Sequence, residues 1–164
     1  MGKEEFKKLF EMHFDAIRRY LYYRCSDADL ASDVAQDLFT RIWEKGMDLD
    51  PHNDKALLYK MASDMIVTKL RRKKVELNYI SSIVPDNTVH ADQYSGNNPE
   101  YNELAKQYSD ALVSMPEKQR VAFLLSRNEN LKYQEISQRL NISVKAVEKR
   151  VSGALEILRK KLSD

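Results

Sequence analysis

Two amphipathic runs separated by a short break lie near the C-terminal end of this chain, and they constrain its fold more than any other feature. The first run, residues 133–140, places Ile136 and Leu140 four residues apart, so both side chains lie on one face of a helix. Asn141 ends this run, because asparagine tolerates the left-handed backbone conformation. Ser143 is a good N-cap for a second helix that begins directly after it. The pattern predicts a helix-turn-helix.

The second helix is predicted to have one apolar side and one polar side. At about 100° per residue, one arc holds the residues that we expect to pack, namely Val147, Val151, Ala154, Leu155, Leu158 and Leu162. In a helix-turn-helix the opposite side enters the major groove of DNA. The residues expected to contact base edges there are Lys145, Glu148, Lys149 and Ser152, with Arg150 as a flanking phosphate contact. Gly153 falls on the same side and is expected to leave a gap in it. A solvated basic helix face is the alternative.

The spacing of apolar residues in the rest of the chain is helical as well. The 164 residues include only four Gly and four Pro, and no alternating strand pattern or hairpin dipeptide is found. An all-α fold is therefore expected. The length suits one domain or two small ones.

Three helices are predicted in the N-terminal half, and they can form one bundle. The first covers residues 4–22. The second, residues 26–45, opens with Ser26 and Asp29, whose spacing resembles a capping box. The third ends in the basic run 69–74, where a helix dipole also favours positive charge.

The helical periodicity is lost between Ser81 and Asn97, where Ser, Asn, Asp, Pro and Gly gather. We therefore expect residues 1–76 to form one small helical domain and residues 98–164 to form a second one. A flexible linker of residues 77–97 would join them. The C-terminal domain is expected to contain four helices, the last two of which form the helix-turn-helix.

The start of the C-terminal domain carries two helix-capping signals. Asn98 precedes Pro99, and proline is tolerated at the first helical position. Ser114 and Glu117 are spaced as a capping box for the following helix. Residues 111–164 contain 11 Lys and Arg against 6 Asp and Glu, a balance that suits contact with phosphates.

Several classes of protein are not favoured by the sequence. Cys25 is the only cysteine, which fits a reducing cytoplasm, and His13, His52 and His90 are too scattered for a metal site. We expect no metal, no cofactor and no catalytic residue, because no phosphate loop or nucleophile motif is present. The N-terminus is too charged for a signal peptide, and no apolar run suits a membrane span, so a cytoplasmic protein without membrane insertion is expected.

A family resemblance covers nearly the whole chain. In the C-terminal half it is carried by Leu112, Met115, Pro116, Gln119, Arg120, Phe123, Glu135, Ile136, Leu140, Ile142, Ser143, Val147, Arg150, Ala154, Leu155, Leu158, Arg159 and Leu162. These residues resemble region 4 of the extracytoplasmic-function (ECF) group of the sigma-70 family. The resemblance implies that this half reads the minus-35 promoter element.

The N-terminal half supplies the more discriminating match. Its residues Ala31, Asp33, Gln36, Phe39 and Trp43 resemble the A-x-D-x-x-Q-x-x-F-x-x-x-W segment of region 2 in the same family. By this resemblance, the polar contacts to core RNA polymerase would come from Asp33, Gln36 and Asp37. The aromatic pair Phe39 and Trp43 is expected to lie in the core, as such residues ordinarily do.

The third helix resembles the family segment that helps to open and hold the minus-10 element. Tyr59, Ala62, Arg71 and Arg72 match that segment, whereas Leu57, Asp64 and Thr68 depart from it. The resemblance implies a minus-10 contact by Tyr59 as a stacking residue and by Arg71, Arg72 and Lys73 through phosphates. The alternative for Tyr59 is packing in the core.

The resemblance implies an alternative sigma factor, which binds core RNA polymerase, directs it to promoter DNA and is not itself an enzyme. It also implies an anti-sigma factor as a further partner. Two rivals remain open from the sequence. A helix-turn-helix repressor or activator would bind palindromic DNA as a dimer. An adaptor would keep the fold without promoter opening, as the departures at Leu57, Asp64 and Thr68 suggest.

Overall fold

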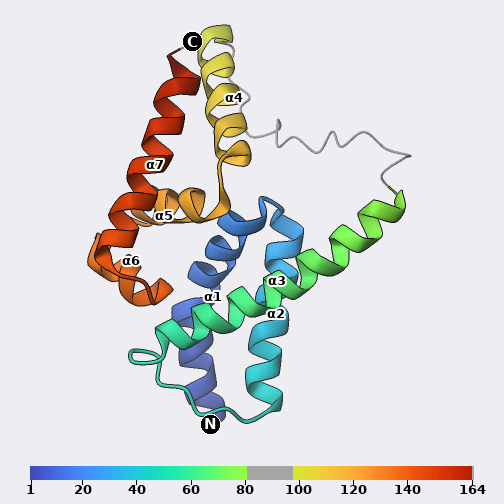
Figure 1. Ribbon diagram of the computed structural model, residues 1–164. Coiled ribbons are helices and arrows are strands. Elements are labelled where there is room, and N and C mark those ends of the chain that lie inside the picture. The colour runs from blue at the N-terminus through green and yellow to red at the C-terminus, as the bar shows by residue number, and fades with distance from the viewer. Residues whose placement is uncertain (81–97, 164) are drawn as a thin grey trace.

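The computed structural model describes residues 1–80 and 98–163, with side chains in residues 1–72 and 98–163. All regular secondary structure in these residues is helical, so the predicted all-α fold is confirmed for them (Figure 1). The helices are α1 (Lys3–Cys25), α2 (Ala28–Glu44), α3 (Lys55–Ile80), α4 (Pro99–Ser114), α5 (Glu117–Asn128), α6 (Tyr133–Leu140) and α7 (Val144–Leu162). We call α1–α3 the N-terminal module and α4–α7 the C-terminal module.

The N-terminal module is a bundle in which α1 packs against α2 and both pack against α3. Its core contains fully buried aliphatic side chains from all three helices, including Leu9, Ile17, Leu38, Ile42 and Ile66. Their three-residue and four-residue spacings place them on one face of each helix, which explains why these segments become buried amphipathic helices.

The start of α2 differs from the predicted capping box. Ser26 adopts a left-handed conformation with φ of 56° and ends α1, and its backbone N–H donates to the Tyr22 carbonyl. Asp27 is the N-cap of α2, and its carboxylate accepts a hydrogen bond of 3.1 Å from the Leu30 N–H. The prediction of Ser26 as the cap was wrong because a residue in this conformation closes the preceding helix.

The helix α3 is longer than predicted. It continues past the basic run 69–74 to Ile80, so helical structure extends into the range 77–97 that the sequence assigns to the linker. No Gly or Pro interrupts this stretch, and Lys, Arg and Glu are good helix formers. The rest of the expected linker, residues 81–97, lies outside the described residues.

The C-terminal module surrounds α7, which packs against α4, α5 and α6. The predicted cap of α4 is confirmed, since the Asn98 side chain accepts hydrogen bonds from the Glu100 and Tyr101 N–H groups, and Pro99 is the first helical residue. The capping box predicted for α5 was wrong. Pro116 is the N-cap, and the Ser114 hydroxyl instead donates to the Ala111 carbonyl within α4.

The two modules touch along two lines of contact. The helix α5 lies against α1, and α6 lies against α3 (Figure 1). In the described part of the chain, no helix combines the length and apolar character that crossing a membrane requires.

Candidate nucleic-acid interface

The helix-turn-helix is formed as its sequence predicts. Asn141 adopts the left-handed conformation with φ of 54° and ends α6. The Ile142 N–H donates to the Ser137 carbonyl at 3.1 Å, and Ser143 caps α7 by accepting a hydrogen bond of 3.0 Å from the Ala146 N–H. The turn is therefore set by local side-chain and backbone bonds.

The packed side of α7 is made by Val147, Val151, Ala154 and Leu158, which are buried. The residues predicted to contact base edges, Lys145, Glu148, Lys149 and Ser152, are all exposed, whereas Arg150 is half-buried on the flank. The helix thus presents one continuous polar side that its own module leaves uncovered. Such a side has donors and acceptors that can reach base edges in a major groove.

Two positions on α7 differ from the helical-wheel prediction. Gly153 does not leave a gap in the exposed side, because it faces α5, where a Cβ would lie 2.7 Å from the side-chain nitrogen of Gln119. Leu155, which was expected to pack, is exposed. The physical reason is that more than one helix packs on α7. The covered arc therefore extends toward the side of Gly153 and the partly buried Ile157, and it leaves Leu155 outside.

The residues predicted to contact polymerase lie on the outer side of α2. Asp33, Gln36 and Asp37 are all exposed there. Phe39 is buried as expected, with 2% of its surface exposed, but the core prediction for Trp43 was wrong, since 48% of that side chain is exposed.

Trp43 borders an aromatic groove between α1 and α2. Its ring lies 5.0 Å from that of Phe6, and Phe10 packs edge-on against Phe39 at 5.3 Å. Gln36 also lines this groove, which has a volume of about 510 Å³. Gln36 and Trp43 are seven residues apart and therefore lie on one face of α2. Because Gln36 is polar, this spacing is the sequence signal that could have revealed the exposure of the tryptophan.

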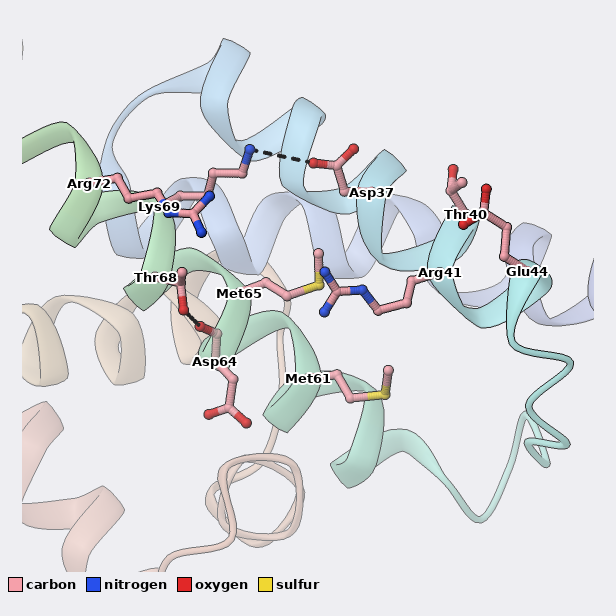
Figure 2. A pocket seen from close by; sticks show the side chains of 10 residues that line it. All are labelled: Asp37, Thr40, Arg41, Glu44, Met61, Asp64, Met65, Thr68, Lys69 and Arg72. Carbon is pink, nitrogen blue, oxygen red and sulfur yellow. Dashed lines mark hydrogen bonds and ion pairs between the residues drawn. The ribbon is translucent and has the colours of Figure 1, made fainter.

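A second, polar cleft of about 490 Å³ lies between α2 and α3 (Figure 2). Lys69 and Asp37 close one end with an ion pair of 3.7 Å. Figure 2 shows the Arg41 side chain extending from α2 toward α3, and the carboxylate of Asp64, another residue that lines the cleft, pointing away from α2. Asp64, one of the departures from the family segment, is exposed, so water solvates its charge.

The residues predicted to contact the minus-10 element do not lie together. Arg71 and Arg72 are exposed on α3, whereas Tyr59 is buried with 3% of its surface exposed. The Tyr59 ring packs on Tyr20 at 4.9 Å, and its hydroxyl accepts a long hydrogen bond of 3.5 Å from Arg139 of α6. Burial raises the pKa of the Tyr59 phenol. In this arrangement the ring packs in the core and is not available to stack on a base. The side chain of Lys73 lies outside the described residues.

The structure offers no metal-binding cluster among its described side chains. His13 is buried, and since a carbonyl can only accept, its Nε2–H donates to the Pro51 carbonyl at 2.6 Å. Cys25 is half-buried, and its thiol bonds to the Asp27 carbonyl at 3.3 Å. His90, the third of the scattered histidines, lies outside the described residues.

Comparisons with known proteins cover both modules. The chain matches the sigma-70 region 2 family over residues 9–75 and the sigma-70 region 4 family over residues 105–158. It is 28% identical to the ferric citrate uptake sigma factor FecI of Escherichia coli over 153 residues, which covers 92% of this chain and 87% of FecI. It is 25% identical over 175 residues to the ECF RNA polymerase sigma factor SigW of Bacillus subtilis, covering 99% and 91%.

The fold is also similar to a solved structure. The sigma factor RpoE of Bartonella quintana, determined in complex with the anti-sigma factor NepR, superposes with a TM-score of 0.69 at 21% identity over 98% of both chains. The two helical modules and the helix-turn-helix thus define a bipartite transcription protein. The chain belongs to the sigma-70 family, in its extracytoplasmic-function group. It is an alternative sigma factor, which binds core RNA polymerase and directs transcription from promoters.

Proposed function

We propose that the two modules of this sigma factor divide promoter recognition between them. Residues 98–164 would read the minus-35 element, and residues 1–76 would bind polymerase and the minus-10 element, with residues 77–97 as the linker. One observation supports this division: the side of α7 that lies opposite its packed residues is polar and uncovered. Its proposed contacts are Lys145, Glu148, Lys149 and Ser152 to bases and Arg150 to phosphate.

For the N-terminal module, the proposed polymerase contacts are Asp33, Gln36 and Asp37, which share the exposed side of α2. Arg71, Arg72 and Lys73 would hold the minus-10 strand through phosphates. Tyr59 could stack on a base only if α6 moved away from α3, because Arg139 now covers it.

The minus-35 assignment is tested with the full chain and labelled promoter DNA. Lys149→Ala is expected to weaken binding roughly 5-fold to 150-fold if the lysine reads a base, which corresponds to ~1 to 3 kcal/mol. Lys106→Ala is the matched control, since Lys106 is exposed on α4 and its loss changes the net charge equally. Equal binding by the two variants would remove Lys149 from the interface.

The polymerase assignment is tested by capture of core RNA polymerase. Gln36→Ala is expected to weaken capture, while binding of the variant to isolated minus-35 DNA stays unchanged. Gln134→Ala is the control, because this glutamine is exposed on α6 in the other module. Unchanged capture by Gln36→Ala would overturn the assignment.

We further propose that the chain acts in the cytoplasm, has no enzymatic activity of its own and is held by an anti-sigma factor. Sigma factors are regulatory subunits, and the sigma factor of similar fold was determined with such a partner. The dimeric repressor is not favoured, because it gives no reason for a region 2 match over residues 9–75. Transcription with purified core polymerase separates the sigma factor from an adaptor that has lost promoter opening.

A further inference from the structure

The first residue of α7 is an exposed valine. Val144 directly follows the N-cap Ser143, and 39% of its surface is exposed. Valine is a poorer helix former than alanine, because its branched side chain loses rotamer freedom in a helix. The cap is supplied by Ser143, whose hydroxyl accepts from the Ala146 N–H. Neither helix formation nor core packing therefore accounts for an apolar side chain at this position.

Val144 lies at the edge of the polar side that α7 leaves uncovered. At about 100° per residue, it is about 40° around the helix from Glu148, which is one turn further along. Residues four apart are neighbours on a helix surface, so the valine methyl groups continue the exposed surface that Lys145 and Glu148 form. The methyl groups thus lie beside side chains that are proposed to contact bases.

A second exposed apolar residue of α7 lies at a different height along the helix. Leu155 is 37% exposed, but it is about 16 Å from Val144 along the helix axis at 1.5 Å per residue. In a helix-turn-helix, the N-terminal residues of the second helix contact the base edges. The position along the helix therefore selects Val144 as the apolar residue that enters the groove.

One base presents a methyl group in the major groove. Thymine carries its C5-methyl there, whereas adenine, guanine and cytosine are read through hydrogen-bond donors and acceptors. A valine side chain can neither donate nor accept a hydrogen bond, and a base-edge donor that it covered would be left unpaired at a cost in free energy. Contact with the thymine methyl instead removes apolar surface of both groups from water, which is favourable.

We propose that Val144 is a specificity-determining residue of this sigma factor, which selects thymine in the minus-35 element through contact with the C5-methyl group. The selected base pair neighbours the one that Glu148 contacts, because the two side chains are one helical turn apart. The inference rests on the proposed reading of the minus-35 element by α7. It adds an apolar contact to an interface whose other proposed contacts are all polar.

The experiment uses holoenzyme assembled from core RNA polymerase and the full chain. Promoter duplexes that bind the wild type are first selected from a library whose minus-35 segment is randomised. Each thymine of the selected segment, on either strand, is then replaced singly by uracil, which lacks the C5-methyl group and is otherwise identical. For the wild type, replacement at one position is expected to weaken binding roughly 4-fold, the effect of removing one buried methyl group.

Val144→Ala is expected to bind the selected duplex roughly 3-fold to 10-fold less tightly and to lose the response to uracil at that one thymine. Its responses at all other thymines should match the wild type, so the double-mutant cycle locates the contact. Val144→Thr keeps one methyl group and should retain part of the response. Val113→Ala is the matched control, because Val113 is exposed on α4 and the same two methyl groups are removed.

The fold of the variant is checked separately from its binding to DNA. Val144 is exposed and alanine favours helix, so Val144→Ala should keep the helix content of the wild type and its capture by core polymerase. Circular dichroism and polymerase capture measure these two properties. A loss of binding is then assigned to the interface with DNA.

Two results would overturn the proposal. One is a Val144→Ala holoenzyme that responds to uracil at every thymine as the wild type does, and the other is a selected segment in which no A·T pair is favoured. The Lys149→Ala variant separates this failure from that of the minus-35 assignment. If Lys149→Ala weakens binding while the uracil responses stay equal, only the role of Val144 is wrong. If Lys149→Ala and Val144→Ala both bind like the wild type, α7 does not read this element and both proposals are wrong.

Discussion

Gly153 of α7 faces Gln119 of α5 so closely that a Cβ on the glycine would lie 2.7 Å from Nε2 of the glutamine. No side chain fits at that distance unless Gln119 moves. The oxygen of the same amide is buried and accepts no hydrogen bond among the described residues. The close approach of α5 and α7 thus depends on the absence of a side chain at this position.

This contact predicts a coupled response to substitution. Gly153→Ala should gain about 1 kcal/mol of stability from helix propensity when Gln119 is also changed to Ala. In the wild-type background the displaced glutamine should offset most of that gain. Urea denaturation of the four proteins in the double-mutant cycle measures the coupling. An identical effect of Gly153→Ala in both backgrounds would show that the glutamine moves freely.

The two aromatic residues of the α2 segment should differ in their contribution to stability. Phe39→Ala removes a buried ring and is expected to cost about 3 to 5 kcal/mol. Trp43→Ala should cost clearly less, because nearly half of the indole is exposed. Chemical denaturation followed by circular dichroism compares them, since this signal does not depend on the single tryptophan. Equal losses would mean that Trp43 is a core residue after all.

His13 should make stability depend on pH. Burial lowers its pKa below the ordinary value of 6.5, and the hydrogen bond to Pro51 opposes this shift only in part. The nearby cations Lys55 and Arg139, and His52, lower the pKa further. The folded chain therefore favours the neutral imidazole. The stability that it contributes is present above pH 6.5 and is lost as the pH falls from there through the folded-state pKa.

The control for this effect is His13→Gln, whose amide N–H can still donate to the Pro51 carbonyl but does not titrate. Unfolding free energies between pH 7.0 and pH 5.5 should fall less in this variant than in wild type. This range lies above the titration of most carboxylates. Parallel pH profiles would exclude His13 as the source of the dependence.

The junction of α1 and α2 predicts opposite effects at two neighbouring residues. Asp27→Ala should cost about 0.5 to 2 kcal/mol, because it removes the cap of α2. Ser26→Gly should instead stabilise the protein by up to about 1 kcal/mol, since glycine adopts the left-handed conformation without strain. Thermal or urea denaturation measures both. A loss on Ser26→Gly would indicate that the serine side chain supports the junction.

The features that sequence predicts well here are those set by near neighbours. Asn141 and Ser143 define the turn of the helix-turn-helix through bonds to residues a few positions away, and both adopt the predicted conformations. Asn98 caps α4 in the same local way. Such signals need no knowledge of the remaining chain.

The predictions that differed from the structure depend on distant neighbours. The helical wheel placed Gly153 opposite the packed side because it assumed a single packing direction, whereas several helices cover α7. Trp43 was expected to be buried, as aromatic residues usually are, yet it lies exposed at the edge of the α1–α2 contact. No local pattern reveals that Arg139 covers Tyr59, since the two residues are far apart in the sequence.

The buried Arg120 of α5 donates to the Tyr23 and Arg24 carbonyls at the end of α1, and this contact affects how the free chain denatures. If α5 unfolds, the last carbonyls of α1 lose their hydrogen-bond donor, and if α1 unfolds, the buried guanidinium of Arg120 loses two acceptors. Unfolding of either module therefore destabilises the other. The free subunit should melt in one calorimetric transition although it contains two cores. A chain whose two cores no longer touch should instead behave as two independent folding units.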